Sequence, residues 1–500
     1  MKANIPRDIA PYAKALAAQF PVLSIQGPRQ SGKTTLAKTL FPDYGYVNLE
    51  YPDLRAEAEI DGTSFLRLHP APLIIDEAQR VPSLLSRIQV IVDERSGENG
   101  LYILTGSHQP ALRAGVGQSL AGRVGGLTLL PLSIAELTAA GIFSGREQRI
   151  VEGFMPRLFS EHQTPLELYR NYAETYLEKD VSQLTRLRER RPFETFVRLL
   201  AGRVGQLYNV GGIADEIGVS AQTLRGWLSI LEACHLVFLL PPYYRNFGKR
   251  FIKTPKVYFS EPGLASWQLG IRDARQAVRD PTFGGLFENM VVVEALKTRL
   301  NAGRTPDLYF IRDQHGTEID LVIEDSGVLH LFEIKSSASF SPDFTKNLVT
   351  LRKAIPVWRG DPGGRISDRN DRADPHFPET GESISVQSPH PARHGHPVLR
   401  DDLRKISLSG VERLWHVRNR FFGEQPAGLE EPAGSVFDGR RDRPRLVETL
   451  YRHASGRRCD GFRDEQDQKL PDDGDRVSRD HRGAAAVVPV GVGYSVVHHV

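Results

Sequence analysis

Short apolar runs alternate with stretches of helical periodicity over residues 1–140 of this sequence. The apolar runs with strand character cover residues 21–26, 46–49, 73–77 and 101–107. Most of them are nearly continuous, which is typical of strands buried on both faces of a parallel sheet. Helices are expected over residues 7–20 and 35–40. The pattern therefore predicts an α/β domain with a parallel sheet in residues 1–140, with ligands at the carboxyl ends of its strands.

The middle and later parts of the chain carry mostly helical periodicity. Residues 141–205 predict a helical connector with long helices over 166–190 and 193–204. Residues 276–355 predict a small α/β domain, which begins with a helix over residues 283–300. Its strands are expected at 308–312, 318–323 and 329–335.

Residues 206–275 have the pattern of a helix-turn-helix followed by two wing strands. A short helix ends at Gly218, and Ser220 is placed to cap a second helix. In a DNA-binding protein this second helix would lie in the major groove. Its exposed positions supply Gln222, Thr223 and Arg225, whereas the basic residues cluster in and beside the wing, at Arg245, Lys249, Arg250, Lys253 and Lys256. A winged-helix-like segment is predicted, and it serves either to read DNA or as a packing or protein-contact module.

Composition changes sharply after Ile355. Gly, Pro, Asp, His and Arg dominate residues 356–500, and no sustained period appears there. Such a segment buries too little apolar surface to offset its ordering entropy, so we expect disorder. An alternative hypothesis is a reading-frame change near Pro356, because GC-rich DNA translated out of frame yields an arginine-rich, lysine-poor amino-acid sequence.

Overall composition narrows the class of protein. Of 500 residues, 40% are hydrophobic and 25% are charged, as in soluble globular proteins. No apolar run reaches the ~18 residues of a membrane span, and the N-terminus has no signal-peptide core. Cys234 and Cys459 suggest no disulfide framework. A net charge of +3 does not require a nucleic-acid partner. We expect a cytoplasmic protein without membrane contacts.

Residues 27–34 read Gly-x-x-x-x-Gly-Lys-Thr, between a predicted strand and a predicted helix. This context predicts a P-loop, whose backbone N–H groups surround phosphates at a helix N-terminus. Lys33 would contact the β- and γ-phosphates, and the Thr34 hydroxyl would bind Mg²⁺. The residues expected to contact the nucleotide are Gly27, Pro28, Arg29, Gln30, Ser31, Gly32, Lys33, Thr34 and Thr35.

The strand predicted at residues 73–77 ends in two carboxylates, Asp76 and Glu77. Beside a P-loop, Asp76 would hold Mg²⁺ directly or through water. Glu77 would orient and deprotonate the attacking water. This is a Walker B pattern, and together with the P-loop it predicts binding and hydrolysis of a nucleotide.

Three further residues are candidates for the same site. Thr105 and Ser107 end another buried strand and would contact the γ-phosphate, unless they are a plain strand end. Arg123 would neutralise charge as the γ-phosphoryl departs, in its own chain or from a neighbouring subunit. A surface or structural role for Arg123 is the alternative.

Several of these motifs resemble a known family. They are Ile74 to Glu77, Leu104 to Ser107, Ser119 to Val124, Pro131 to Ser133 with Glu136 and Leu137, Tyr176 to Val181, Lys253 to Phe259, and Gly263 to Ala265. Together they resemble prokaryotic AAA+-type ATPases with a C-terminal DUF4143 domain, over residues 5–355. The resemblance implies an AAA+-like core and ATP as the nucleotide. Glu261 stands where family members usually have Asp.

A second group of residues resembles the PD-(D/E)xK nuclease core. Asp320 is followed by Glu333 and Lys335 in neighbouring strands, and Glu288 lies on the preceding helix. Asp320 and Glu333 would share a hard cation such as Mg²⁺. Lys335 would stabilise the transition state or orient water, and Glu288 would complete the site. Because fold does not imply activity, a module that binds DNA or a partner without cutting is the alternative.

Three functions follow from these patterns. The first is a Mg²⁺-dependent ATPase whose nucleotide state controls the C-terminal module on DNA or a protein partner. The second is an ATP-gated, metal-dependent nuclease. The third is a non-catalytic, nucleotide-dependent interaction module. The sequence does not indicate the oligomeric state.

Overall fold

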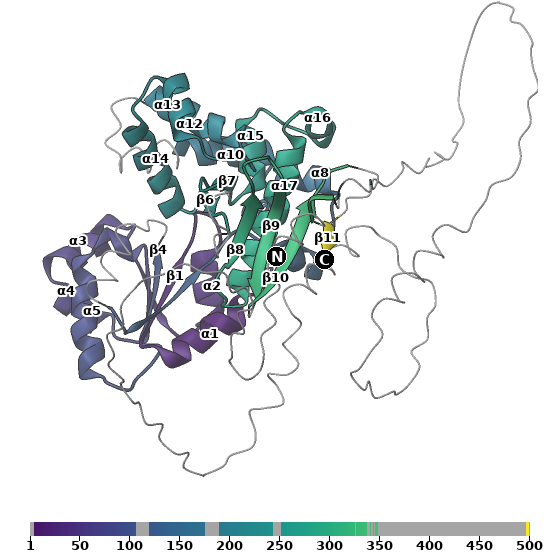
Figure 1. Cartoon of the computed structure of the whole chain (residues 1–500). Coiled ribbons are helices and arrows are strands. Elements are labelled where there is room, and N and C mark those ends of the chain that lie inside the picture. Colours follow the sequence, from purple (N-terminus) through teal and green to yellow (C-terminus); the bar gives the residue numbers. More distant parts are fainter. Residues whose placement is uncertain are drawn as a thin grey trace, which may run out of the picture. The chain divides into compact units, whose positions relative to one another are not determined.

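The computed structural model describes residues 5–106, 120–175, 190–243, 252–325, 327–337, 341, 344, 346–348 and 497–499. The sequence predictions for residues 356–496 therefore lie outside the described residues. So do Ser107, Ser119, Tyr176 to Val181, and Arg245, Lys249 and Arg250. Figure 1 shows how the described elements are arranged.

The first part of the chain is built on a five-stranded parallel sheet, which confirms the predicted α/β fold. The strands are β1 (Val22–Gln26), β2 (Gly45–Asn48), β3 (Leu73–Asp76), β4 (Tyr102–Gly106) and β5 (Val124–Thr128). Their spatial order is β2-β3-β4-β1-β5, so that β4 separates the strand before the P-loop from the acidic strand. Because every pairing is parallel, the carboxyl ends of β1, β3 and β4 meet at one edge of the sheet.

Helices cover both faces of this sheet, because successive side chains of each strand point to opposite faces. On one face, Leu23, Ile74 and Ile103 pack against α1 (Ala10–Gln19) and α2 (Lys33–Leu40). On the other face, Val22 and Ile75 pack against α3, α4 and α5. These helices span Pro52–Ile60, Gly62–Leu68 and Ser83–Glu94, and the short 3₁₀ helix η1 spans Ala78–Arg80. The near-continuous apolar runs of the sequence thus reflect burial from two sides.

The middle of the chain is helical up to a helix-turn-helix and a two-stranded wing. The first helices are α7 (Ile134–Ala139), α8 (Arg146–Glu152), α9 (Pro156–Ser160), α10 (Pro165–Tyr172) and α12 (Arg190–Ala201). Next come α13 (Val210–Ile217), α14 (Ala221–Ala233), β6 (Val237–Leu240), β7 (Lys256–Phe259), α15 (Pro262–Gln268) and α16 (Ala274–Arg279). Gly218 ends α13 in the left-handed conformation, and the Ser220 side chain caps α14 as predicted. The strands β6 and β7 pair antiparallel.

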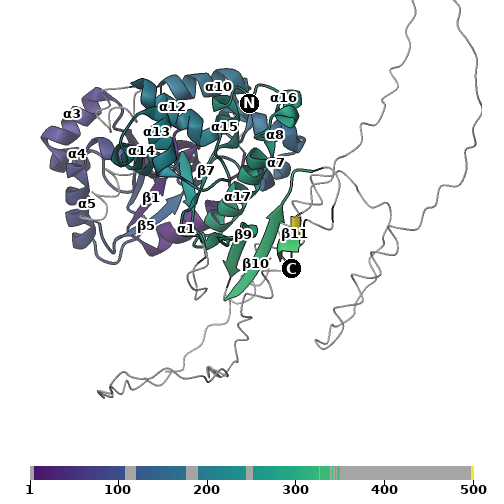
Figure 2. The ribbon, with the colours of Figure 1, turned by 45° about the horizontal axis from the view of Figure 1, so that its top comes forward.

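The last part combines one long helix with an antiparallel sheet. These elements are α17 (Phe283–Asn301), β8 (Leu308–Arg312), β9 (Glu318–Asp325), β10 (Val328–Ile334) and β11 (Val497–His499), and the strand order is β11-β10-β9-β8. Figure 2 shows α17 between the middle helices and this sheet. One apolar cluster runs from Phe154 and Trp227 through Leu286 to Leu321, so the middle and last parts share a core. The strand β11 was not predicted from the sequence, and it pairs with the edge of β10.

Candidate functional site

The P-loop takes the shape that its glycines permit. Gly27 has φ 147°, and a Cβ there would lie 2.1 Å from the carbonyl oxygen of Leu129, so no other residue fits. Gly32 has φ 96° and is the N-cap residue of α2, whose first residue is Lys33. Gln30 also has a positive φ, of 64°. The Ser31 hydroxyl is buried without a hydrogen-bond partner among the described residues. The loop is therefore folded tightly around the N-terminus of α2.

Lys33 is a buried cation within this loop. Its Nζ donates to the carbonyl oxygens of Gly27, at 3.1 Å, and Pro28, at 2.7 Å. Burial lowers its pKa to about 8, although the negative charges of Glu77 and Asp76 partly offset this effect. Carbonyl oxygens solvate an ammonium group but do not neutralise it, so the loop suits an anion as its ligand.

Asp76 lies at the end of β3 and accepts hydrogen bonds from three hydroxyl groups. Thr34 Oγ1 is 3.1 and 2.9 Å from the two carboxylate oxygens, and the Tyr46 hydroxyl is 2.9 Å from one of them. The Thr105 hydroxyl also donates to Asp76. Asp76 is only 5% exposed. Among the described residues its hydrogen-bond partners are these neutral hydroxyl groups, and no cationic side chain forms an ion pair with it. A buried carboxylate paired with the P-loop threonine fits a magnesium-bound nucleotide.

Glu77 follows Asp76 in the left-handed conformation, with φ 55°. This turn ends the strand and begins η1, and the Gln79 side chain donates to the Glu77 carboxylate. The pair of adjacent carboxylates thus lies at the P-loop edge of the sheet, as predicted.

A cavity of about 240 Å³ adjoins the P-loop. Its walls come from the N-terminal segment, from α2 and from the middle helices, and include Ile5, Pro6, Thr35, Leu36, Thr39, Leu40, Leu132 and Pro156. Arg7 fixes this segment to the loop, because it donates to the carbonyl oxygen of Ser31 at 2.8 Å and to Glu136 at 3.0 Å. A mostly apolar slot next to a phosphate-binding loop suits a nucleotide base.

The residues predicted for a nuclease-like site also come together. Asp320 on β9 and Glu333 on β10 lie on neighbouring strands. Lys335 Nζ is 2.7 Å from Glu333 and 3.4 Å from Asp320, and the backbone N–H of Ile334 donates to Asp320 at 2.7 Å. Glu288 of α17 faces the same group from the other side. Burial, followed by repulsion from Asp320, raises the pKa of Glu333 to about 7.

Lys256 occupies the centre of these acidic side chains. It is 1% exposed, and its Nζ lies 2.9 Å from Glu288, in contact with Glu318 and 3.9 Å from Asp320. The Tyr258 hydroxyl donates to the same Glu288 oxygen at 2.6 Å. Burial raises the pKa of Glu288 to about 7 against the pull of Lys256. Burial alone would lower the pKa of Lys256, but the three carboxylates raise it above its usual value.

Three family models match the chain. An AAA domain covers residues 19–138, DUF8612 (a domain of unknown function) covers 145–275, and DUF4143 (also of unknown function) covers 283–375. The last match extends past residue 355, where the resemblance was expected to end. Two curated relatives are called uncharacterized, Mb2031c of Mycobacterium bovis and Rv2008c of Mycobacterium tuberculosis. Each is 32% identical over 364 residues, which is 70% of this chain and 78% of the relative.

The chain belongs to the AAA-type ATP-binding proteins with a C-terminal DUF4143 domain. Among solved structures, the Walker-type ATPase paby2304 of Pyrococcus abyssi covers 52% of the chain, and 94% of that structure is covered. It is 15% identical, with a TM-score of 0.36. The STAND protein with a tetratricopeptide repeat sensor, PH0952 of Pyrococcus horikoshii, is 13% identical with a TM-score of 0.18. That match covers 61% of this chain and 48% of the other.

Two expected nucleotide contacts differ in this AAA–DUF4143 protein. The Thr105 hydroxyl is already bound to Asp76, because β4 lies next to β3. Arg123 precedes β5, and its guanidinium pairs with Asp93, at 2.5 and 2.9 Å. Its carbonyl oxygen accepts from the N–H of Val22, where β1 begins, so Arg123 lies at the sheet edge opposite the P-loop. A role in its own chain's site is not supported, and a role in a neighbouring subunit stays a prediction.

Sequence reasoning missed Tyr46, Arg7 and Lys256. Lys256 was grouped with the basic residues of the wing, yet it is buried and is not available to DNA. The sequence did contain a signal for the buried position of Lys256, because Lys256 and Tyr258 project to the same side of an otherwise apolar strand. A lysine in a buried strand requires a carboxylate partner. The partners of Tyr46 and Arg7, in contrast, depend on tertiary contacts.

No helix in the part of the chain that the structure describes is both long and apolar enough to cross a membrane. Within the same residues, no group of three or more His, Cys, Asp or Glu side chains is arranged to hold a metal ion. The Lys256 ammonium lies among the carboxylates of Glu288, Glu318 and Asp320, and these four residues are called the DUF4143 cluster below. The metal-binding roles of Asp320 and Glu333 stay a prediction, and Lys335 contacts both of these carboxylates.

The lowered pKa of Lys33 predicts a pH dependence of nucleotide binding. A bound triphosphate would raise this pKa again, so binding takes up a proton when the free protein is deprotonated. Affinity for Mg²⁺-ATP should be constant below the free pKa of about 8 and fall as the pH rises above it. The limiting slope is about tenfold per pH unit. Calorimetry in buffers of different ionisation enthalpy would count the protons; constant affinity with no proton uptake above that pH would contradict the assignment.

Proposed function

We propose that this protein is a Mg²⁺-dependent ATPase whose nucleotide state controls its C-terminal module. The observation that supports hydrolysis best is the contact of Thr34 with Asp76, next to the buried Lys33. In this proposal Lys33 binds the β- and γ-phosphates, and Thr34 and Asp76 hold Mg²⁺. Glu77 orients the attacking water and takes its proton. Bound Mg²⁺ supplies neutralisation of charge on the phosphate oxygens.

The cavity beside the loop supports ATP as the nucleotide. Its apolar walls, from Ile5 and Pro6 on one side and α2 on the other, offer surface for a base. The AAA domain match over residues 19–138 includes the P-loop and the acidic strand. A cytoplasmic location, predicted from the sequence, belongs to the same proposal.

A continuous set of polar contacts supports control of the C-terminal module. Arg7 bridges the P-loop carbonyl of Ser31 and the buried carboxylate of Glu136. Glu136 belongs to the capping box that begins α7. The next N–H of this turn, that of Ile134, donates at 2.8 Å to Glu294 on α17. The P-loop and the helix that carries Glu288 are thus connected through the first turn of α7.

Lys297 strengthens the same connection. Its Nζ donates at 2.8 Å to the carbonyl oxygen of Leu132 and at 2.7 Å to Glu294. Lys297 is 1% exposed and lies over the ring of Phe154, 3.8 Å from its centroid. Because these groups are buried and paired, a shift of the α7 turn would require α17 to move with it or leave charges unpaired.

The target of the module is proposed to be DNA or a protein partner. The helix-turn-helix presents Gln222 and Arg225 at exposed positions of α14, while Leu224, Trp227 and Leu228 are buried as predicted. This surface is only weakly basic in the described residues. A contact with protein is therefore the form of the proposal that the exposed face of α14 favours.

Glu77→Gln should retain ATP binding and lose most of its turnover. A general base contributes roughly 100-fold or more to such a reaction, so phosphate release should fall by about that factor. The matched control is Glu59→Gln, which makes the same charge change at an exposed position of α3. Phosphate release and equilibrium ATP binding would be measured on all three proteins. Unchanged turnover in Glu77→Gln would contradict the role of Glu77.

Arg7→Met should uncouple α17 from the nucleotide. In the parent protein, saturating ATP should change the hydrogen-exchange protection of residues 283–301, and Arg7→Met should lose that change while it still binds ATP. Arg55→Met removes a cation from α3 and should behave like the parent. The measurement is hydrogen exchange by mass spectrometry, with and without ATP. An identical ATP response in Arg7→Met would rule out this route.

A further inference from the structure

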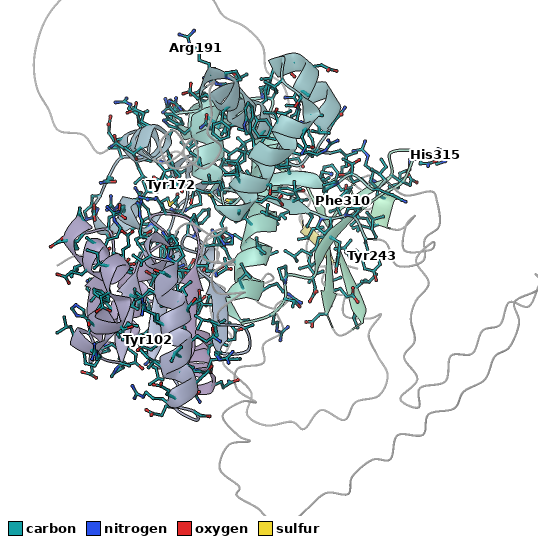
Figure 3. The ribbon with its side chains drawn as sticks, turned by 90° about the vertical axis from the view of Figure 1, so that its left-hand side faces the viewer. Tyr102, Tyr172, Arg191, Tyr243, Phe310 and His315 are labelled. Atoms are coloured by element: carbon teal, nitrogen blue, oxygen red, sulfur yellow. The ribbon has the colours of Figure 1, made fainter. Side chains whose placement is uncertain are left out.

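The DUF4143 cluster joins three segments that are distant in the sequence. Lys256 comes from the wing strand β7, Glu288 from α17, and Glu318 and Asp320 from β9. Gly205, after α12, packs on the Glu288 carboxylate, since a Cβ there would lie 3.1 Å from it. The ring of Phe310, labelled in Figure 3, lies 5.5 Å from Lys256 Nζ and closes another side. The ammonium group is therefore enclosed by carboxylates and an aromatic ring.

Most of the carboxylate oxygens that a divalent cation would need are already engaged. Lys256 and Tyr258 bind one oxygen of Glu288, and Lys256 and Arg312 bind the two oxygens of Glu318. Ile334 N–H and Lys335 bind one oxygen of Asp320, and Lys256 faces the other. Glu333 keeps one oxygen, Oε2, that is buried without a partner among the described residues. The second oxygen of Glu288 and Oδ1 of Asp320, which is 3.9 Å from Lys256 Nζ, also receive no hydrogen bond among the described residues. These oxygens alone do not make up the roughly six ligands of Mg²⁺, so water would have to supply the rest.

Charge also disfavours a metal at the oxygens that remain. A second cation placed among these carboxylates would be repelled by the Lys256 ammonium at close range in a poorly solvated site. Binding of a metal ion would require that Lys256 leave the cluster, and its buried ammonium group would then lose its carboxylate partners.

We propose that Lys256 is the resident cation of this cluster and takes the place that a divalent metal has in nuclease-like sites. The cluster then works as a metal-independent lock that ties the wing strand to α17 and to the C-terminal sheet. The DUF4143 module accordingly does not hydrolyse phosphodiesters here, and it acts by binding. This inference does not depend on the proposed ATPase.

The decisive variant is Lys256→Met, which keeps the length of the side chain and removes the charge. Thermal unfolding of the full chain would be recorded without nucleotide, in EDTA and in MnCl₂, with Asp76→Asn in every protein to remove the nucleotide-site carboxylate, so that the Asp76→Asn protein serves as the parent. The parent should unfold at the same temperature in both. Lys256→Met should unfold at a lower temperature in EDTA and recover in Mn²⁺, because its freed carboxylates now accept a metal. Lys253→Met, an exposed neighbour, should behave like the parent.

A second measurement covers the case in which Lys256→Met does not fold. Mn²⁺ binding would be followed by electron paramagnetic resonance in Asp76→Asn, which removes the nucleotide-site carboxylate, and in Asp76→Asn combined with Asp320→Asn. The proposal expects the same binding in both proteins. A bound Mn²⁺ that disappears with Asp320→Asn would overturn it. So would a folded Lys256→Met protein as stable in EDTA as the parent, or plasmid cleavage in Mn²⁺ that Asp320→Ala abolishes.

Discussion

The nucleotide site depends on one buried carboxylate that is hydrogen-bonded but not neutralised. Asp76 accepts hydrogen bonds from the hydroxyl groups of Thr34 on α2, Tyr46 on β2 and Thr105 on β4. Neutral donors compensate for the loss of water around a carboxylate, yet they leave its charge in place. Lys33, the nearby cation, is held by loop carbonyls instead. Both charges therefore remain available to a ligand, and in the proposed ATPase the negative one serves the metal and the positive one the phosphates.

The DUF4143 cluster uses the same residue types with the opposite result. There the lysine lies among the carboxylates and forms ion pairs with them, so that cation and anions satisfy each other within the protein. The difference between the two sites is one of placement. In the first, a tight glycine-dependent turn holds the lysine on the loop carbonyls. In the second, a buried strand carries the lysine into the acidic group. Similar composition thus produces a binding site in one place and a structural junction in the other.

The parts of this protein that the sequence predicts well are those encoded by neighbouring residues. The P-loop, the acidic strand end and the capped helix-turn-helix are each specified by spacing within about ten residues. What sequence reasoning could not supply is the order of strands. Because β4 lies between β1 and β3, the Thr105 hydroxyl can donate to Asp76. Because β5 pairs with β1, Arg123 lies at the edge of the sheet opposite the P-loop. The position of Lys256 likewise depends on α17 and β9, which lie far along the chain.

The shared apolar cluster around α17 bears on how such a chain can be divided. Phe283, Leu286 and Met290 belong to a core that also contains residues of the middle helices and of the C-terminal sheet. A cut at the family boundary near residue 280 would open that core on both fragments and expose apolar surface on each. The DUF8612 and DUF4143 segments are therefore expected to be inherited and exchanged as one recombination unit, even though two family models describe them.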